Sequence, residues 1–437
     1  TGIITATRKD PSTTPAGKVQ MNVSFQINAD TPSGTTFKNT PVSVINKSRV
    51  TGQEVTLTTY KQTTDKHWTE GSQVVDDKTY IASDTINARV EMSLPDPSTL
   101  TKKLTKVQLV DDYTQLAKYV SDPSDIRVEE NGKDVTDQYT IATANGHITA
   151  TRKDPSTTPA GTVALIAHFK INADTPSGTK LVNAGSGTLN NETVPTNNPI
   201  VNTYTPTTDK HWTEGSQVVD GKVYIDASET HTDVTMSLPD PATLAKKLTK
   251  VSVTDDYSKF AQYVDYESAQ VLENGKDVTN EYTISVANGK VVATRKDAST
   301  TPAGTVDLHV NFKIHSDVAS GTSLVNSGSG TINDETIATP DRTVKTYKQD
   351  TNKTWNVGDQ TVNDKLVINN DQVQSTISMT LPDQNTLAKK LTKVQLVDDY
   401  SGLSKYADVK TVEIRENGKD VSDQYNVQND GSHITAT

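Results

Sequence analysis

Apolar residues occupy every second position of a nine-residue stretch that occurs three times in the chain. The first copy spans residues 19–27, and its apolar positions are repeated by Val163, Leu165, Ala167, Phe169 and Ile171, and again by Val306, Leu308, Val310, Phe312 and Ile314. An alternation of period two places every second side chain on one face of a strand. Each copy therefore predicts a half-buried β-strand.

Two further alternating segments recur in the same order. In the first segment the apolar positions of the three copies are Val90, Met92 and Leu94; Val234, Met236 and Leu238; and Ile377, Met379 and Leu381. In the second segment they are Val107 and Leu109; Val251 and Val253; and Val394 and Leu396. Asn145–Gly146 and Asn288–Gly289 supply hairpin turns with positive φ. Short helical segments are predicted around residues 99–104 and 114–120. We expect an all-β fold, with one immunoglobulin-like antiparallel β-sandwich and one or two short helices per repeat.

The repeat itself is the size of a domain. The run TTDKHWTEGSQVVD at residues 63–76 returns unchanged at 207–220, and Trp68, Trp212 and Trp355 mark a period of about 144 residues. Solenoid repeats are much shorter than this. The predicted boundaries give the end of one repeat, two complete repeats and the beginning of another, at residues 1–60, 61–204, 205–347 and 348–437.

Composition narrows the function classes. The formal net charge of −11 argues against nucleic acid and anionic membranes as partners, and the absence of cysteine excludes disulfides. The sequence lacks the common nucleotide-binding, zinc-protease and serine-hydrolase motifs. His67 and His211 recur, but Thr354 replaces them in the third copy, so no metal site is expected. No cofactor is predicted, and no ligand spacing supports a structural calcium ion.

Three polar residue types recur inside the apolar strand faces. A lysine lies two residues before each tryptophan, an asparagine lies two residues after an apolar residue, and an aspartate continues the inward alternation of the 107–109 type. These residues are Lys66, Lys210 and Lys353; Asn39, Asn183 and Asn326; and Asp111, Asp255 and Asp398. A lone buried charge is costly unless it is paired. The recurrence of all three together therefore calls for a chemical explanation.

An intramolecular Lys–Asn isopeptide bond explains the trio. Burial lowers the pKa of a lysine toward the neutral, nucleophilic amine. A buried protonated carboxyl can polarise the asparagine carbonyl and carry protons while ammonia leaves. The indoles of Trp68, Trp212 and Trp355 would keep water out. The reaction is a single turnover of the domain on itself, and it would join the first strand of each sandwich to one of its last.

Simpler interpretations remain open for each residue. Lys66 and Trp68 could form an exposed cation–π pair. Asn183 could be a turn residue, and Asp111 a helix N-cap before Tyr113. Three other asparagines recur in phase and are rival acceptors: Asn46, Asn190 and Asn333.

Together, the Val-Asp-Asp-Tyr runs at 110–113 and 397–400, the Lys-x-Trp strand and the Leu/Phe-x-Asn strand resemble the C-terminal domains of antigen I/II-type surface adhesins of Gram-positive bacteria. The resemblance implies cross-links between Lys66 and Asn183 and between Lys210 and Asn326, each beside an aspartate. Lys353 and Asn39 would be halves of cross-links whose partners lie outside the chain. A second acidic motif of that family, Trp-Asp-Leu, reads Met-Ser-Leu or Met-Thr-Leu here.

These observations predict the function of a stalk. Acidic, cysteine-free, cross-linked and nearly identical repeats would hold a binding tip away from a cell wall and resist force and proteolysis. The expected location is extracellular and wall-anchored, with neighbouring repeats as partners and a host ligand bound by a domain outside this chain. The alternative is that the repeats themselves bind a host glycan or protein.

Overall fold

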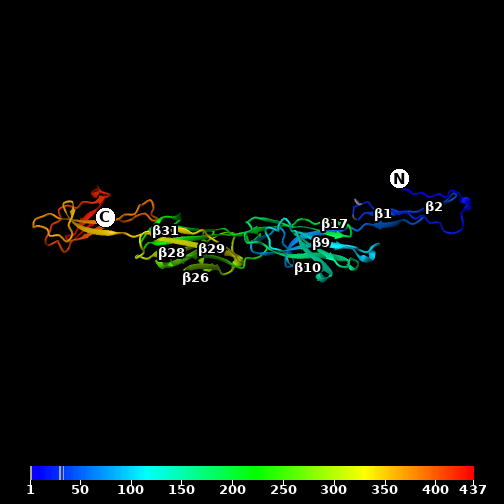
Figure 1. The fold of residues 1–437 in the computed structure, drawn as a ribbon, viewed down its shortest axis with the longest axis horizontal. Helices are drawn as coiled ribbons and strands as arrows, with labels where there is room; N and C mark the ends of the chain where they lie inside the picture. Colours follow the sequence, from blue (N-terminus) through cyan, green and yellow to red (C-terminus); the bar gives the residue numbers. More distant parts are fainter. Residues whose placement is uncertain (1, 29–30, 33) are drawn as a thin grey trace.

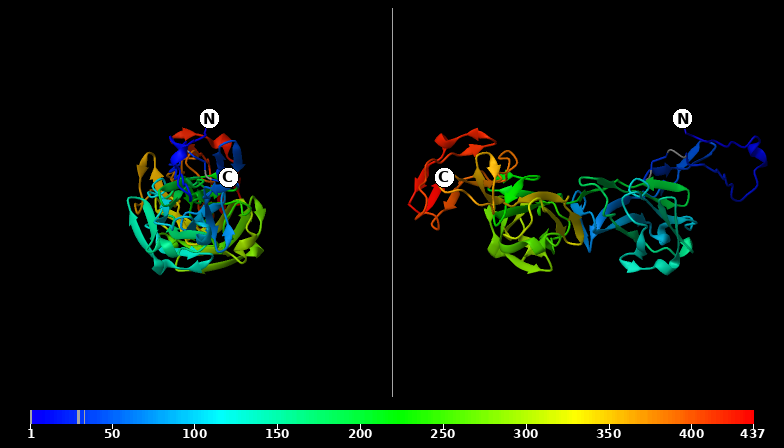
Figure 2. Two further views of the ribbon diagram at one scale, coloured as in Figure 1. Left: turned by 90° about the vertical axis from the view of Figure 1, so that its right-hand side faces the viewer. Right: turned by 60° about the vertical axis from the view of Figure 1, so that its left-hand side comes forward.

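The computed structural model describes residues 2–28, 31–32 and 34–437. Two β-sandwiches follow one another along a rod, with smaller β-structures at both ends (Figure 1). Seen along the rod, these parts overlap within one narrow cross-section (Figure 2). The sequence-predicted β-sandwich architecture is confirmed.

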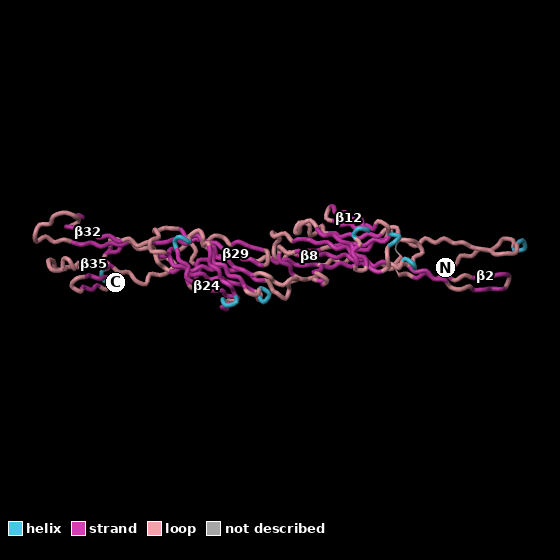
Figure 3. Tube along the Cα trace, turned by 90° about the horizontal axis from the view of Figure 1, so that it is seen from below, coloured by secondary structure: helices cyan, strands magenta, loops and turns pink. Residues whose placement is uncertain are grey.

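Helical structure in the described residues is limited to three-residue 3₁₀ turns (Figure 3). These are η1 (Pro11–Thr13), η2 (Pro97–Thr99), η3 (Thr136–Gln138), η4 (Pro155–Thr157), η5 (Ala261–Tyr263), η6 (Thr279–Glu281), η7 (Ala298–Thr300) and η8 (Ser422–Gln424). The helical segments are therefore shorter than predicted. Only η2 touches the predicted segment 99–104, and residues 114–119 form consecutive turns.

The first complete repeat packs a six-stranded sheet against a five-stranded sheet. The strands of the six-stranded sheet have the order β11 (Lys133–Asp134), β10 (Ser124–Glu130), β14 (Gly161–Lys170), β8 (Thr85–Leu94), β5 (Thr64–Glu70) and β6 (Gln73–Val74). The strands of the five-stranded sheet have the order β12 (Tyr139–Ala144), β13 (His147–Arg152), β9 (Val107–Asp112), β16 (Ala184–Leu189) and β17 (Glu192–Pro195). A small sheet of β15 (Lys180–Val182), β18 (Ile200–Tyr204) and β7 (Thr79–Ile81) closes the end toward the second repeat.

The second complete repeat repeats this arrangement. Its first sheet has the order β20 (Gln217–Val218), β19 (Thr208–Glu214), β22 (Glu229–Leu238), β28 (Gly304–Ile314), β24 (Val264–Glu273), β25 (Lys276–Asp277). Its second has the order β21 (Val223–Ile225), β31 (Arg342–Tyr347), β29 (Ser323–Ile332), β23 (Val251–Asp256), β27 (Lys290–Arg295), β26 (Tyr282–Ala287), with β30 (Glu335–Ala338) paired to β29. The long strand β29 corresponds to β15 and β16 together.

The alternating segments form the centre of each sandwich, as their period predicts. Leu165 of β14 pairs with Val90 of β8, and both side chains are fully buried. The hairpin between β12 and β13 turns on Asn145 and Gly146, both with positive φ. A β-carbon on Gly146 would lie 2.7 Å from Thr114 Cγ2, so close packing also requires glycine here. The predicted hairpin is confirmed.

The partial repeats depart from the prediction at the N-terminal end. Residues 19–27 form no strand, and Val19 is 97% exposed. The corresponding β14 is paired on both sides by β8 and β10. Among the described residues, no strand pairs with residues 19–27. The strands present near this end are β1 (Thr36–Asn39), β2 (Val42–Ile45), β3 (Ser48–Thr51) and β4 (Val55–Thr58).

The C-terminal partial repeat forms three small sheets. They consist of β33 (Gln360–Thr361), β32 (Thr351–Val357) and β34 (Gln374–Met379); of β35 (Leu396–Asp399), β39 (His433–Ala436) and β38 (Val427–Asn429); and of β36 (Arg415–Glu416) and β37 (Lys419–Asp420). Their few buried apolar side chains, including Ile414 and Val421, form a small cluster.

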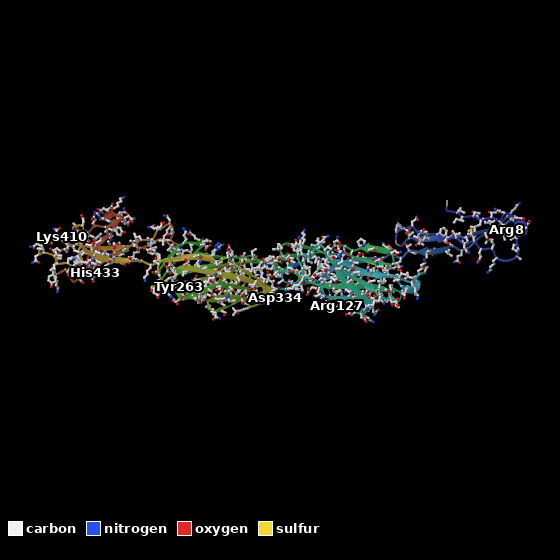
Figure 4. All side chains as sticks on the ribbon, viewed as in Figure 1. Arg8, Arg127, Tyr263, Asp334, Lys410 and His433 are labelled. Carbon is white, nitrogen blue, oxygen red and sulfur yellow. The ribbon has the colours of Figure 1, made fainter. Side chains whose placement is uncertain are left out.

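The two complete repeats meet through backbone hydrogen bonds rather than through a free linker. The amide of Thr79 donates to the carbonyl of Thr243 at 2.8 Å, and the amide of Ala245 donates back to Thr79 at 2.9 Å. Ile81 of the first repeat packs in the hydrophobic cluster of the second. Asp334 lies where the two bodies meet (Figure 4). Because main-chain bonds and an apolar contact both cross the junction, the repeats are set in a fixed register.

Candidate cross-link site

Strand β5 places Lys66 inside the first sandwich. Its side chains alternate between the core and the outer face, which puts Lys66 and Trp68 on the inward face, where both are fully buried. The Nζ of Lys66 lies 2.7 Å from the carbonyl oxygen of Ala184, to which it donates a hydrogen bond. A lysine that carries no exposed surface must find its partners inside the protein.

The partners come from the opposite sheet. Asp111 of β9 is fully buried, and its Oδ1 lies 2.8 Å from Lys66 Nζ. Asn183, between β15 and β16, is also fully buried, and its Nδ2 donates to Asp111 Oδ2 at 3.4 Å. One carboxylate therefore contacts both the amine and the carboxamide, across the core between the two sheets.

The second repeat builds the same trio. Lys210 Nζ lies 2.7 Å from Asp255 Oδ2, and Asn326 Nδ2 donates to the same oxygen at 3.3 Å. All three side chains are fully buried. The alternation predicts that these lysines, asparagines and aspartates point inward, and in both complete repeats they do.

Burial dominates the electrostatics of these groups. Desolvation lowers the pKa of Lys66 and of Lys210, and the attraction of Asp111 or Asp255 only partly opposes it. Desolvation likewise raises the pKa of Asp111, against the opposing effect of Lys66. Both directions favour a neutral amine beside a protonated carboxyl, which is the state in which lysine is a nucleophile.

The asparagine carbonyl oxygens are available for polarisation. Oδ1 of Asn183 and Oδ1 of Asn326 are buried and have no hydrogen-bond partner in the described part of the chain. A buried acceptor without a partner is costly. A carboxyl that takes up a proton becomes a donor, and rotation of the neighbouring amide would let it bond to this oxygen and make the amide carbon more electrophilic.

The tryptophans close the site on the same strand face. Trp68 is fully buried and packs edge-on against Phe169 at 6.5 Å between ring centroids. Trp212 is also fully buried and packs against Phe260 at 5.3 Å. Both indoles therefore lie in the apolar core, on the same strand face as the lysine.

Sequence reasoning missed the groups that hold the lysine backbone. The amide of Asn197 brackets Lys66: its Oδ1 accepts from the Lys66 amide and its Nδ2 donates to the Lys66 carbonyl, both at 2.7 Å. In the second repeat Arg342 Nε donates to the Lys210 carbonyl at 2.7 Å. The lysine backbone is held by an asparagine in the first repeat and by an arginine in the second. A search for recurring residues therefore could not find these contacts.

The simpler interpretations do not describe these residues. Lys66 is buried rather than exposed, and Asn183 lacks the positive φ of a turn residue. Asp112, not Asp111, accepts the hydrogen bond from the amide of Thr114. The rival acceptors Asn46, Asn190 and Asn333 all have positive φ and occupy turns. Asn190 Oδ1 accepts from the Thr105 amide at 2.7 Å, which is a turn-capping role.

The partial repeats hold incomplete versions of the site. Lys353 Nζ lies 2.6 Å from Asp398 Oδ1, but the lysine side chain is 41% exposed. Trp355 is only partly buried, so it shields this lysine less than predicted. Asn39 lies in β1 and is exposed. Neither end therefore brings a lysine, an asparagine and an aspartate together.

Within residues 2–28, 31–32 and 34–437, no three His, Asp or Glu side chains gather as metal ligands would. His211 instead lies 2.9 Å from Asp209 and from Asp220 in surface pairs. None of the described helical elements is long and apolar enough to span a membrane.

Comparisons with known proteins agree with this architecture. The profile of the family described as cell surface antigen I/II C2 terminal domain matches residues 60–204 and 206–343. The C-terminal domain of the Streptococcus agalactiae AgI/II polypeptide BspA is 13% identical, with a TM-score of 0.54, and the match covers 65% of this chain and 100% of that one. A comparison with curated proteins gave no match.

A second solved structure is similar to the same extent. The C-terminal domain of the Streptococcus pyogenes antigen I/II-family protein AspA is 14% identical, with a TM-score of 0.55, over 64% of this chain and 98% of that one. At such identities the likeness shows the fold alone. The two adjacent family matches, in contrast, cover more than half of the chain, and the family is one of surface-protein domains rather than enzymes. The chain belongs to the cell surface antigen I/II C2 terminal domain family.

Proposed function

We propose that the chain is part of the stalk of a bacterial surface adhesin and that its complete repeats are closed by autocatalytic Lys66–Asn183 and Lys210–Asn326 isopeptide bonds. The observation that carries the proposal is the buried carboxylate that contacts both the lysine and the asparagine in each complete repeat. A buried ion pair is costly, and its presence in both complete repeats supports a use beyond packing.

The chemistry needs no cofactor. A proton passes from the lysine ammonium to Asp111, which leaves a neutral amine and a carboxylic acid. The amine nitrogen attacks Cγ of Asn183, and the acid donates to the amide oxygen. Asp111 then takes a proton from the attacking nitrogen and delivers one to the departing nitrogen. The Cγ–Nδ2 bond breaks and one ammonia leaves, while the oxygen returns its proton to Asp111 as the carbonyl re-forms, so that an Nζ–Cγ amide and a protonated Asp111 remain.

The position of the bond gives it a mechanical role. Lys66 lies on β5, the first strand of the repeat. Asn183 immediately precedes β16, which is one of the last strands of the repeat. The two strands belong to opposite sheets. A covalent bond between them would carry tension past most of the sandwich, so that the strands enclosed by the bond bear no load.

The junctions support the stalk role. The hydrogen bonds at Thr79 have counterparts at the next junction, where the Val223 amide donates to the Thr386 carbonyl and the Ala388 amide donates to Val223, both at 2.9 Å. Repeats joined in this way form a stiff row (Figure 1). Such a row would project a binding domain from the surface of a Gram-positive cell, with anchorage to the wall outside this chain.

The alternative, a repeat that binds glycans itself, finds less support. Aromatic platforms for sugars must be exposed, and Trp68 and Trp212 are fully buried. A glycan array probed with residues 61–347 should therefore be silent if the repeats act only as a stalk.

Peptide mapping tests the proposed bond at the level of single residues. Digestion of the denatured chain should release branched peptides in which the segment containing Lys66 is joined to the segment containing Asn183, and likewise for Lys210 and Asn326. The joining amide should disappear from the first repeat in Asn183→Ala and stay in the second, which serves as an internal control. Recovery of only linear peptides from both repeats would refute the proposal.

A further inference from the structure

The two complete repeats differ at one buried position beside the carboxylate. Thr232 of β22 is fully buried, and its hydroxyl donates to Asp255 Oδ2 at 2.6 Å. The corresponding residue of β8 in the first repeat is Ala88, which is fully buried and offers no donor. The correspondence follows from the pairing, because Thr232 lies opposite Trp212 and Ala88 lies opposite Trp68.

This difference changes how the carboxylate is used. In the first repeat, Asp111 divides its oxygens: Oδ1 faces Lys66, and Oδ2 accepts from Asn183. The group therefore bridges the amine and the carboxamide with separate oxygens. This is the geometry required to take a proton from one nitrogen and deliver it to the other.

In the second repeat the contacts converge on one oxygen. Asp255 Oδ2 receives Lys210, Thr232 and Asn326, while its Oδ1 is buried without a hydrogen-bond partner among the described residues. A hydroxyl that donates to a carboxylate stabilises its ionised form. It therefore opposes the proton transfer that must precede attack by the lysine.

We propose that Thr232 is a positioning residue that slows formation of the Lys210–Asn326 bond relative to the Lys66–Asn183 bond, by holding Asp255 as an acceptor through one oxygen only. The inference rests on the proposed cross-link. It adds that the two repeats close at different rates, although their lysine, asparagine and aspartate are the same. No atoms are exchanged with Thr232: the hydroxyl keeps its proton, and ammonia is still the only leaving group.

The C-terminal partial repeat carries a hydroxyl at the same place. Ser375 of β34 lies opposite Trp355, as Thr232 lies opposite Trp212. Ser375 Oγ is buried without a hydrogen-bond partner in the described part of the chain, so only Thr232 donates to the aspartate of its repeat. The position is therefore one at which the sequence sets the environment of the acid without altering the reacting groups.

Kinetics within a single chain test the inference. Unreacted chain, translated in a cell-free system and captured in urea before folding, would be diluted into native buffer and quenched at intervals. Digestion then gives the fraction of branched peptide for each repeat. We expect the first repeat to react about tenfold faster, the effect of losing one hydrogen bond to a charged group. Thr232→Val, which keeps the shape but removes the hydroxyl, should bring the second repeat to the rate of the first.

The reciprocal pair controls for packing. Ala88→Thr should slow the first repeat, whereas Ala88→Val adds the same bulk without a donor and should slow it less. The pH profile separates an electrostatic from a structural role. Because the hydroxyl stabilises the carboxylate, Thr232→Val should move the acid limb of the second repeat's rate profile to higher pH and leave the alkaline limb in place.

The outcomes separate the two proposals. The inference would be overturned, and the cross-link left intact, if bonds formed in both repeats at rates that do not depend on residues 88 and 232. It would also be overturned if Thr232→Val left the acid limb of the second repeat's rate profile unshifted. A chain in which no branched peptide forms at any time or pH would overturn both.

Discussion

A chain with Lys66→Met and Lys210→Met, pulled by its ends, should lengthen by about 400 Å more per complete repeat than the unaltered chain. The extra length is the loop of about 117 residues that each bond encloses, at roughly 3.5 Å per extended residue. In the unaltered chain this loop is bypassed, because tension enters at β5 and leaves through the bond near β16. Single-molecule force spectroscopy measures the difference directly.

Lys353→Met is the matched control for this experiment. Lys353 also pairs with an aspartate, but the buried asparagines of the described residues, Asn183 and Asn326, lie beside the aspartates of the two complete repeats. Its replacement should leave both complete repeats bypassed. If the unaltered chain released the full length of each repeat at moderate force, the bonds would not be carrying the load.

Lys66→Met should also cost the first repeat about 5 kcal/mol in its free energy of unfolding from the lost loop constraint alone. A further loss of about 1–3 kcal/mol is expected because the buried Asp111 carboxyl would lose the amide nitrogen that it contacts in the closed repeat. Urea unfolding of residues 61–347, monitored by hydrogen exchange in each repeat, measures the stability of the two repeats separately. The second repeat then serves as the reference for the loss in the first.

A second variant distinguishes the two causes. Lys66→Met combined with Asp111→Leu removes the unpartnered carboxyl and should recover the second loss but not the first. Lys133→Met, an exposed position in β11, should change little. If the double variant matched the unaltered first repeat in stability, the loop constraint would be absent and so would the bond.

Much of this site could be predicted because it follows strand periodicity. Lys66, two residues before Trp68, and Asp111, two residues after Leu109, both continue an alternation whose inward phase is set by apolar neighbours. Burial then follows from the pleat itself. The next residue, Asp112, has the outward phase of this alternation, and it caps a turn.

The rest of the site and of the fold depends on contacts that no periodic pattern in the sequence indicates. Asn183 and Asn190 recur equally in phase, and only the three-dimensional pairing shows that one faces the core and the other a turn. Ile81 lies in a strand of the first repeat yet completes the core of the second. The segment 19–27 has the period of a strand, but a strand also needs partners, and its alternation could not supply them.

The most direct measurement is the mass of the intact, denatured chain. The account predicts a mass below that of the sequence by two ammonia molecules, by one in Lys66→Met or Lys210→Met after allowing for the substitution, and by none when both lysines are replaced. A chain whose mass equals that of its sequence would contradict the account.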